Sequence, residues 1–360
     1  MVQACAQVIL MQTSVQNESI TRSRDPSQCV FVGGSYMFWF WGSRACAIGV
    51  DLSNDSLKMV QLANSGKGIR LIAGRNEDRP ESVEPGSAGW QRWAVEAIRE
   101  ATATGKFRGK EIMAAIPPRD VFIDHIRIDL PFYDNSSNRK AAAKANDEKV
   151  PQAVFSKIKQ KLPFQPNDAM IKYIPTEQDS ALVVATDRKI IDRHLAIYEK
   201  AGLTIKSISV WPMALVSCYT KFFGRRKADL DAVVMLLDIE TGCTNVVICR
   251  HRRLLYACSI PIEANGIDDE KVLTRLVLEL TACRRHFVSI HQNAQIQRLI
   301  FLSGPAVSAE VYRTIAKQLG IQAQMGDCLA AVDLANPHIA GIDRRDSHVN
   351  WAIAFGLSLS

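Results

Sequence analysis

Two aspartates, Asp51 and Asp238, stand at matching places in the two halves of the 360-residue sequence. Each ends an apolar segment with a strand pattern, and a small polar turn follows it, at 53–56 and at 240–243. Backbone N–H groups in such turns can approach a phosphate closely. Mg²⁺ takes oxygen ligands and keeps several of its waters, so the two carboxylates could hold it through water. Two such hairpins, facing each other across a cleft, would bind a triphosphate with hydrated magnesium.

The alternative is that each aspartate only begins a hairpin turn. The sequence favours a binding site because both hairpins continue in the same way, into a third strand and then a helix. Neither G-x-x-x-x-G-K-[ST] nor G-x-G-x-x-G occurs in the chain. A P-loop and a dinucleotide fingerprint are therefore excluded.

The periodicity of the apolar residues predicts the elements that position these turns. In the first half we expect strands at 45–50, 57–62, 69–73 and 111–116 and a helix at 90–103. The middle predicts strands at 122–130, 180–185 and 205–210, helices at 150–162, 188–201 and 212–223, and a polar loop at 133–149. The second half predicts strands at 232–237, 245–249, 254–261 and 298–302 and helices at 268–290, 309–319 and 349–357.

Composition narrows the class of protein. With 47% hydrophobic and 22% charged residues, a chain of this length has room for two domains and a sizeable core. Nine cysteines without any C-x-x-C spacing favour free thiols in a reducing compartment over a disulfide framework or zinc site. No apolar run reaches the roughly 20 residues of a membrane span. The first ten residues carry no positive charge, so we expect a cytoplasmic protein.

The net charge of +7 gathers partly in two clusters, at 225–227 and 250–253. Such a balance permits nucleic acid or acidic lipid as a partner without requiring either. No nucleic-acid-binding motif accompanies the clusters, so we interpret them as a solvated face. Residues 1–36 lack any sustained period, and we interpret them as a disordered leader or an upstream extension of the reading frame.

An ordered set of segments resembles the PilM family of type IV pilus assembly proteins, within the actin-like ATPase superfamily. Segment 48–58 is similar to the family's first phosphate loop, 236–247 to the second, and 299–306 to the adenosine loop. The tail at 351–357 resembles the closing helix, and the run at 182–215 resembles the inserted subdomain. That insertion favours PilM over the chaperone and sugar-kinase branches, and the cell-division protein FtsA is a weaker match.

The resemblance implies an α/β protein with the actin-like ATPase fold. Two lobes with mixed sheets would enclose a nucleotide cleft, and a small α/β subdomain would be inserted. The implied parts are a disordered or extended leader (1–44), a first lobe (45–118), the inserted subdomain (119–209), a connecting helix (210–228), a second lobe (229–338) and a C-terminal helix that returns to the first lobe (339–360).

The resemblance also implies ATP and Mg²⁺ as cofactors. Asp51 and Asp238 would hold Mg²⁺ through water, and Gly304 would pass close to the adenosine. The implied phosphate contacts are Ser53, Asn54, Ser56, Lys58, Thr241 and Gly242. Two departures count against hydrolysis more than against binding. Glu240 stands where the family commonly has glycine, and its carboxylate would repel a phosphate unless metal or lysine offsets it. Pro305 follows Gly304 in place of paired glycines, so the backbone there is less free.

The function that the resemblance implies is a cytoplasmic scaffold, peripheral at the inner membrane. It would dock the short N-terminal tail of a bitopic, PilN-like membrane protein and link it to the assembly motor ATPase. The docking groove would lie between the inserted subdomain and the first lobe. We expect no nucleic acid partner and no transmembrane segment in the chain. Alternatives are the cytoplasmic component of a type II secretion platform, and an active ATPase or small-molecule kinase on the same core.

Overall fold

The computed structural model describes residues 45–65, 68–128, 150–177, 179–292, 294–303, 307–334, 342 and 349–360. The leader predicted at 1–44 and the loop predicted at 133–149 lie outside the described residues.

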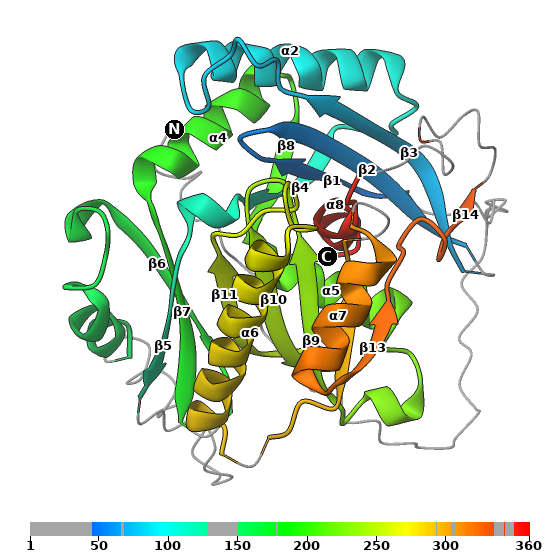
Figure 1. Ribbon diagram of the computed structural model, residues 1–360. Coiled ribbons are helices and arrows are strands. Elements are labelled where there is room, and N and C mark those ends of the chain that lie inside the picture. The colour runs from blue at the N-terminus through cyan, green and yellow to red at the C-terminus, as the bar shows by residue number, and fades with distance from the viewer. Residues whose placement is uncertain are drawn as a thin grey trace, which may run out of the picture.

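The first lobe is built on a six-stranded mixed sheet in the order β14-β3-β2-β1-β4-β8 (Figure 1). Strands β1 to β3 form an antiparallel meander, whereas β4 runs parallel to β1 and β8 parallel to β4. Its strands are β1 (Ala45–Leu52), β2 (Ser56–Ser65), β3 (Gly68–Asp78), β4 (Glu111–Ile116), β8 (Thr204–Val210) and β14 (Asp333–Leu334). Helices α2 (Ala88–Thr104) and α4 (Arg188–Lys200) pack on one face of this sheet.

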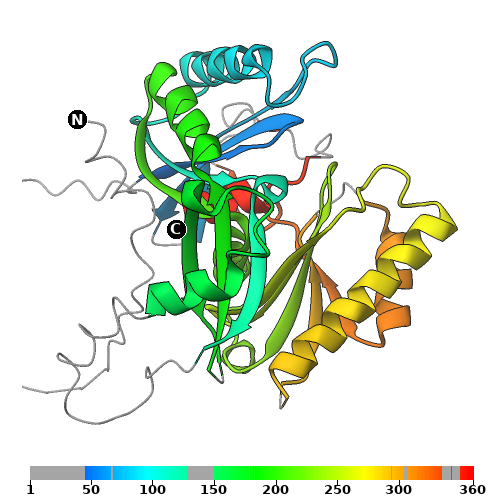
Figure 2. The same cartoon turned by 90° about the vertical axis from the view of Figure 1, so that its left-hand side faces the viewer.

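The second lobe contains a five-stranded sheet in the order β11-β10-β9-β12-β13. Its strands are β9 (Val233–Ile239), β10 (Thr244–Arg250), β11 (Arg253–Ile260), β12 (Arg298–Phe301) and β13 (Gln322–Met325). Helices α6 (Glu270–Ile290) and α7 (Ala309–Leu319) cover its outer face (Figure 2). The Asp269 carboxylate accepts hydrogen bonds from Lys271 N and Val272 N and so caps α6.

A third sheet lies beside both lobes in the order β5-β7-β6. Its antiparallel strands are β5 (Phe122–Arg127), β6 (Ala169–Pro175) and β7 (Ser180–Asp187). A helix at 150–158 buries Val154 and Ile158 against it. In β5, Ile126 is buried and Arg127 is exposed, which is the alternation that the sequence predicted.

Two helices fill the space between the large sheets. They are α5 (Trp211–Phe222) and α8 (Ala352–Ser358), and they share one hydrophobic core with the inner faces of both sheets. Gly49 and Gly356 permit the close contact. A Cβ on Gly49 would lie 2.1 Å from Ala354 O, and one on Gly356 would lie 1.9 Å from Ala214 O.

Most predicted elements are confirmed, whereas β6, β13 and β14 were not predicted. Strand β8 pairs with β4 in the first sheet, although the predicted inserted subdomain extends to residue 209. Likewise, β14 pairs with β3 although it falls within the limits predicted for the second lobe. The domain limits themselves stay a prediction.

Candidate functional site

Strand alternation directs both predicted aspartates to the inner faces of the two large sheets. In β1, Ile48, Val50 and Leu52 pack toward α2 and α4, so Asp51 points the other way. In β9, the odd-numbered residues from Val233 to Ile239 pack toward α6 and α7, so Asp238 also points inward. The repeat of an apolar strand with an inward carboxylate therefore places both acids on the central cleft.

The first hairpin pairs Asp51 with a cation. Lys58 on β2 stands directly opposite Asp51 in the antiparallel register, and Lys58 Nζ lies 3.7 Å from Asp51 Oδ2. The turn between them is held by Ser53, whose Oγ accepts hydrogen bonds from Asp55 N at 3.2 Å and Ser56 N at 3.0 Å. Ser53 N also donates to Ser56 O.

The second hairpin pairs Asp238 with an amide instead. Asn245 on β10 is its cross-strand neighbour, and Asn245 Nδ2 donates to Asp238 Oδ2 at 2.9 Å. Asn350, just before α8, donates to the other carboxylate oxygen at 2.6 Å, and its own Oδ1 accepts from Ala352 N. Both oxygens of this fully buried carboxylate thus have amide partners.

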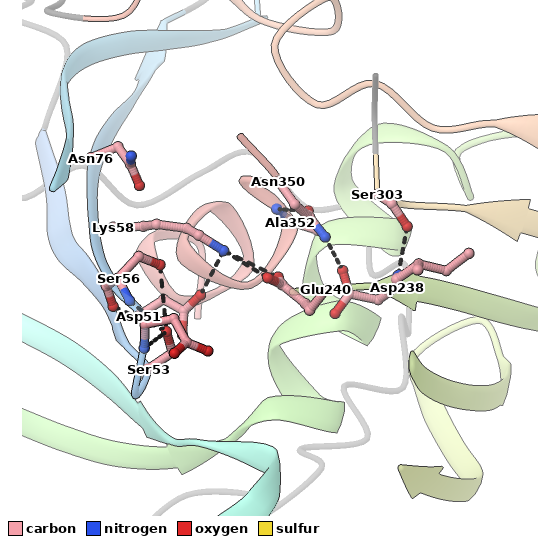
Figure 3. A network of polar contacts seen from close by, with 12 residues as sticks. Asp51, Ser53, Ser56, Lys58, Asn76, Asp238, Glu240, Ser303, Asn350 and Ala352 are labelled. Atoms are coloured by element: carbon pink, nitrogen blue, oxygen red, sulfur yellow. Dashed lines mark hydrogen bonds and ion pairs between the residues drawn. The ribbon is translucent and has the colours of Figure 1, made fainter. Parts of the chain in front are cut away.

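An ion pair joins the two hairpins across the cleft (Figure 3). Lys58 Nζ donates to Glu240 Oε2 at 2.9 Å and to Oε1 at 3.2 Å, between residues 182 positions apart. The side chain of Lys58 is 7% exposed and that of Glu240 is 16% exposed. The lysine ammonium therefore lies between Asp51 of its own hairpin and Glu240 of the facing one.

Burial and charge shift the protonation of this cluster. Burial raises the pKa of Asp51 to about 6, with Glu240 adding to the rise and Lys58 opposing it. Burial raises the pKa of Asp238 to about 7, again reinforced by Glu240 and opposed by its two asparagine donors. Burial opposes the charge of Lys58, but the Glu240 and Asp51 carboxylates outweigh it and hold the lysine pKa above its usual range.

The residue types suit ATP with Mg²⁺, but the two turns leave little room between them in the observed arrangement. The cavity between the two turns measures about 40 Å³. Pockets for small-molecule ligands usually measure about 300–1,000 Å³. The amides of Ser53, Asp55, Ser56 and Glu240 already donate within their own turns. A phosphate could take the place beside Lys58 Nζ that Glu240 occupies only after this ion pair separates.

The predicted site residues are thus only partly brought together. Asp51, Lys58 and Asp238 face one cleft, and Thr241 is exposed at its edge. Residues that line the small cavity include Ser53, Asn54 and Gly242. Gly304 lies outside the described residues. Their roles toward nucleotide stay a prediction. Among the described residues no group of three or more histidine, cysteine or acidic side chains forms a metal site.

Sequence reasoning missed the partners of Asp238 and the direction in which Glu240 points. The signal for Asn245 was present, because Asp51 precedes Lys58 by seven residues and Asp238 precedes Asn245 by the same seven. No local pattern marks Asn350. Ser303, which follows β12, is fully buried, and its Oγ accepts a hydrogen bond from Ile239 N at 2.6 Å.

A larger groove of about 690 Å³ opens beside the cleft. Its apolar lining includes Phe122 on the edge strand β5 and Phe164 after the 150–158 helix, both half-buried. Across from them lie Gly242, Cys243 and the end of β11. The peptide groove was predicted between the inserted subdomain and the first lobe. This one instead lies mainly between the inserted sheet and the second lobe.

No protein-family model matches the sequence, and no curated protein matches it either. Among solved structures, a chain of the PilM–PilN type IV pilus biogenesis complex matches 87% of this chain over 97% of its own length, with a TM-score of 0.69 and 18% identity. An uncharacterised protein with an actin-like ATPase fold from Bacteroides thetaiotaomicron matches 82% of this chain over 96% of its own, with a TM-score of 0.46 and 10% identity.

The cytoplasmic domain of EpsL, from the type II secretion system of Vibrio cholerae, matches 77% of this chain over 94% of its own. Its TM-score is 0.42 and its identity 13%. The chain has the actin-like ATPase fold, and the predicted fold class is confirmed. Within that fold it is similar to a chain of the PilM–PilN complex, so the resemblance to PilM is confirmed at the level of the fold.

Proposed function

We propose that the chain is a cytoplasmic scaffold of type IV pilus assembly, which docks the short cytoplasmic tail of a PilN-like inner-membrane protein and links it to the assembly motor. The observation that supports this most is the groove of about 690 Å³ beside the inserted sheet. The groove occurs in a chain whose fold is similar to that of a chain in the PilM–PilN complex.

The groove has the features that an extended peptide needs. Strand β5 is an edge of its sheet, because β7 pairs with it on one side only. The end of β5 that begins at Phe122 lines the groove, whereas His125 farther along stacks on Tyr256 of the second lobe. A tail could add backbone hydrogen bonds along the free end of β5 and place apolar side chains against Phe122 and Phe164.

In this proposal the membrane partner determines where the scaffold lies in the cell. No helix within the described ranges is long and apolar enough to cross a membrane. The membrane protein's tail would therefore hold the scaffold at the inner membrane. ATP with Mg²⁺ is the proposed cofactor of the cleft. Asp51 and Asp238 would lie toward the metal, and Lys58 toward the phosphates, in an opened arrangement.

The test is a calorimetric titration of the full chain with a synthetic peptide of the N-terminal cytoplasmic tail of a PilN-like membrane protein. We expect a dissociation constant of about 1 μM or tighter, about −8 kcal/mol. Replacing a central aromatic contact typically costs about 2 kcal/mol, so Phe164→Ala and Phe122→Ala should each weaken binding about 30-fold.

Leu278→Ala is the matched control, because Leu278 is 62% exposed on α6, away from the groove lining. Unchanged affinity in both phenylalanine variants would show that the tail binds elsewhere. No binding to the unaltered chain would refute the docking function itself.

A further inference from the structure

Glu240 differs from its counterpart in the other hairpin. Each hairpin has an inward aspartate, and the residue two positions later begins the turn, Ser53 in one and Glu240 in the other. Ser53 stays within its own turn, where its Oγ accepts from two backbone amides. Glu240 N bonds within its turn, to Cys243 O, but the side chain extends across the cleft to Lys58.

The contact that Glu240 makes is the one an anion would make there. Both carboxylate oxygens accept from the single ammonium of Lys58, at 2.9 and 3.2 Å. Lysine binds phosphates in the same manner, as a point charge with several N–H donors. Asp51 Oδ2 lies 3.7 Å from the same Nζ, so the ammonium lies between two carboxylates.

We propose that the Glu240 carboxylate occupies the place that a nucleotide phosphate would take, so that Glu240 and nucleotide compete for Lys58. The proposal rests on the proposed nucleotide cleft. In the absence of nucleotide, the Lys58–Glu240 pair then joins the two hairpins across the cleft. When nucleotide is bound, its phosphate would contact Lys58 instead.

Competition has a defined effect on affinity. If nucleotide enters only the fraction of molecules in which the pair is open, its apparent dissociation constant rises by the inverse of that fraction. Glu240 also raises the pKa of both Asp51 and Asp238. Removing its charge would therefore free Lys58 and, at neutral pH, favour the ionised aspartates that hydrated Mg²⁺ requires.

The experiment compares the full-length protein with Glu240→Gln and Glu240→Gly. Glutamine keeps the size and removes the charge, and glycine removes the side chain. Glu96→Gln is the matched control, since Glu96 is exposed in the middle of α2. Two quantities are measured: binding of ATP·Mg²⁺ by calorimetry, and hydrogen exchange of the two hairpins without nucleotide.

We expect both Glu240 variants to bind ATP·Mg²⁺ at least about tenfold more tightly than the unaltered chain. Without nucleotide, amides in both hairpins should exchange faster in both variants, and Glu96→Gln should change neither quantity. Unchanged ATP affinity in both Glu240 variants overturns the proposal, as does unchanged hairpin exchange. If the unaltered chain fails to bind the tail peptide in the separate titration while the Glu240 variants bind ATP·Mg²⁺ more tightly, the docking function is refuted and the competition stands.

Discussion

Replacing Lys58 by methionine should destabilise the fold strongly, because this lysine compensates several buried carboxylates. Glu240 Oε2 lies 2.9 Å from its ammonium and Asp51 Oδ2 lies 3.7 Å away. At an effective dielectric constant of about 20, opposite charges 3 Å apart attract by about 5–6 kcal/mol. Removing one partner of such a buried pair typically costs about 3–5 kcal/mol of unfolding free energy, and we expect this loss at pH 8.

The loss of unfolding free energy in Lys58→Met should depend on the carboxylate charge that is no longer compensated. In Lys58→Met/Glu240→Gln the uncompensated Glu240 charge is gone. This protein should therefore be more stable than Lys58→Met alone, by about 1–3 kcal/mol. At pH 5, below the pKa values of about 6 for Asp51 and about 7 for Asp238, both acids are largely protonated. The cost of Lys58→Met should then be smaller by about 1–2 kcal/mol.

Urea unfolding followed by circular dichroism, at pH 5 and pH 8, measures these differences. Lys106→Met is the control, because Lys106 is exposed before β4. Two results would refute the idea that Lys58 balances buried carboxylates. One is a loss of unfolding free energy in the double variant equal to the sum of the losses in the two single variants. The other is a Lys58→Met loss that is equal at both pH values.

Two further predictions concern pH and packing. The folded state raises the pKa of Asp51, so its contribution to unfolding free energy is lost as pH rises from about 4 through about 6. As pH rises over that range, the unfolding free energy of Asp51→Asn should therefore increase relative to that of the unaltered chain, on the order of 2 kcal/mol by urea unfolding. A relative decrease over the same range would contradict the raised pKa. Gly49→Ala and Gly356→Ala should each cost about 3 kcal/mol or more, since the new Cβ meets backbone oxygen at 2.1 and 1.9 Å. Gly89→Ala in α2 meets nothing closer than 3.4 Å and should be neutral or stabilising by about 0.5–1 kcal/mol in the same urea unfolding experiments.

The sequence predicted those parts of the fold that short apolar runs mark. Such runs, bounded by small polar turns, marked β1, β2, β9 and β10. The alternation of side chains along a strand then explains why the structure places Asp51 and Asp238 on inner faces. Strand β13 was missed because all four of its residues are exposed, so no apolar period marks it. Strand β14 has only two residues, Asp333 and Leu334, which is too few for any pattern.

The ion pair across the cleft could not be predicted from pattern, because its partners are 182 residues apart. The substitution itself was visible: an acidic residue stood in a turn expected to approach phosphate. That the Glu240 carboxylate would repel a phosphate unless a cation offsets its charge stays a prediction, and Lys58 supplies such a cation. What the sequence could not supply was the direction of the side chain. That direction depends on how closely α5 and α8 bring the two sheets together.

The cleft and the groove share one wall, which couples the two proposed sites. Gly242 and Cys243 line both spaces, and Arg119, which also lines both, donates from Nη2 to Gly242 O at 3.1 Å. Separating Glu240 from Lys58 would move the turn against which a docked tail lies. Binding free energies are reciprocal, so the factor by which ATP·Mg²⁺ changes tail affinity must equal the factor by which the tail changes ATP affinity. In Glu240→Gln, where both ligands can be titrated, we expect this factor to differ from one by at least about threefold, about 0.6 kcal/mol. Tail affinity that is the same with and without saturating ATP·Mg²⁺ would show that the shared turn transmits nothing.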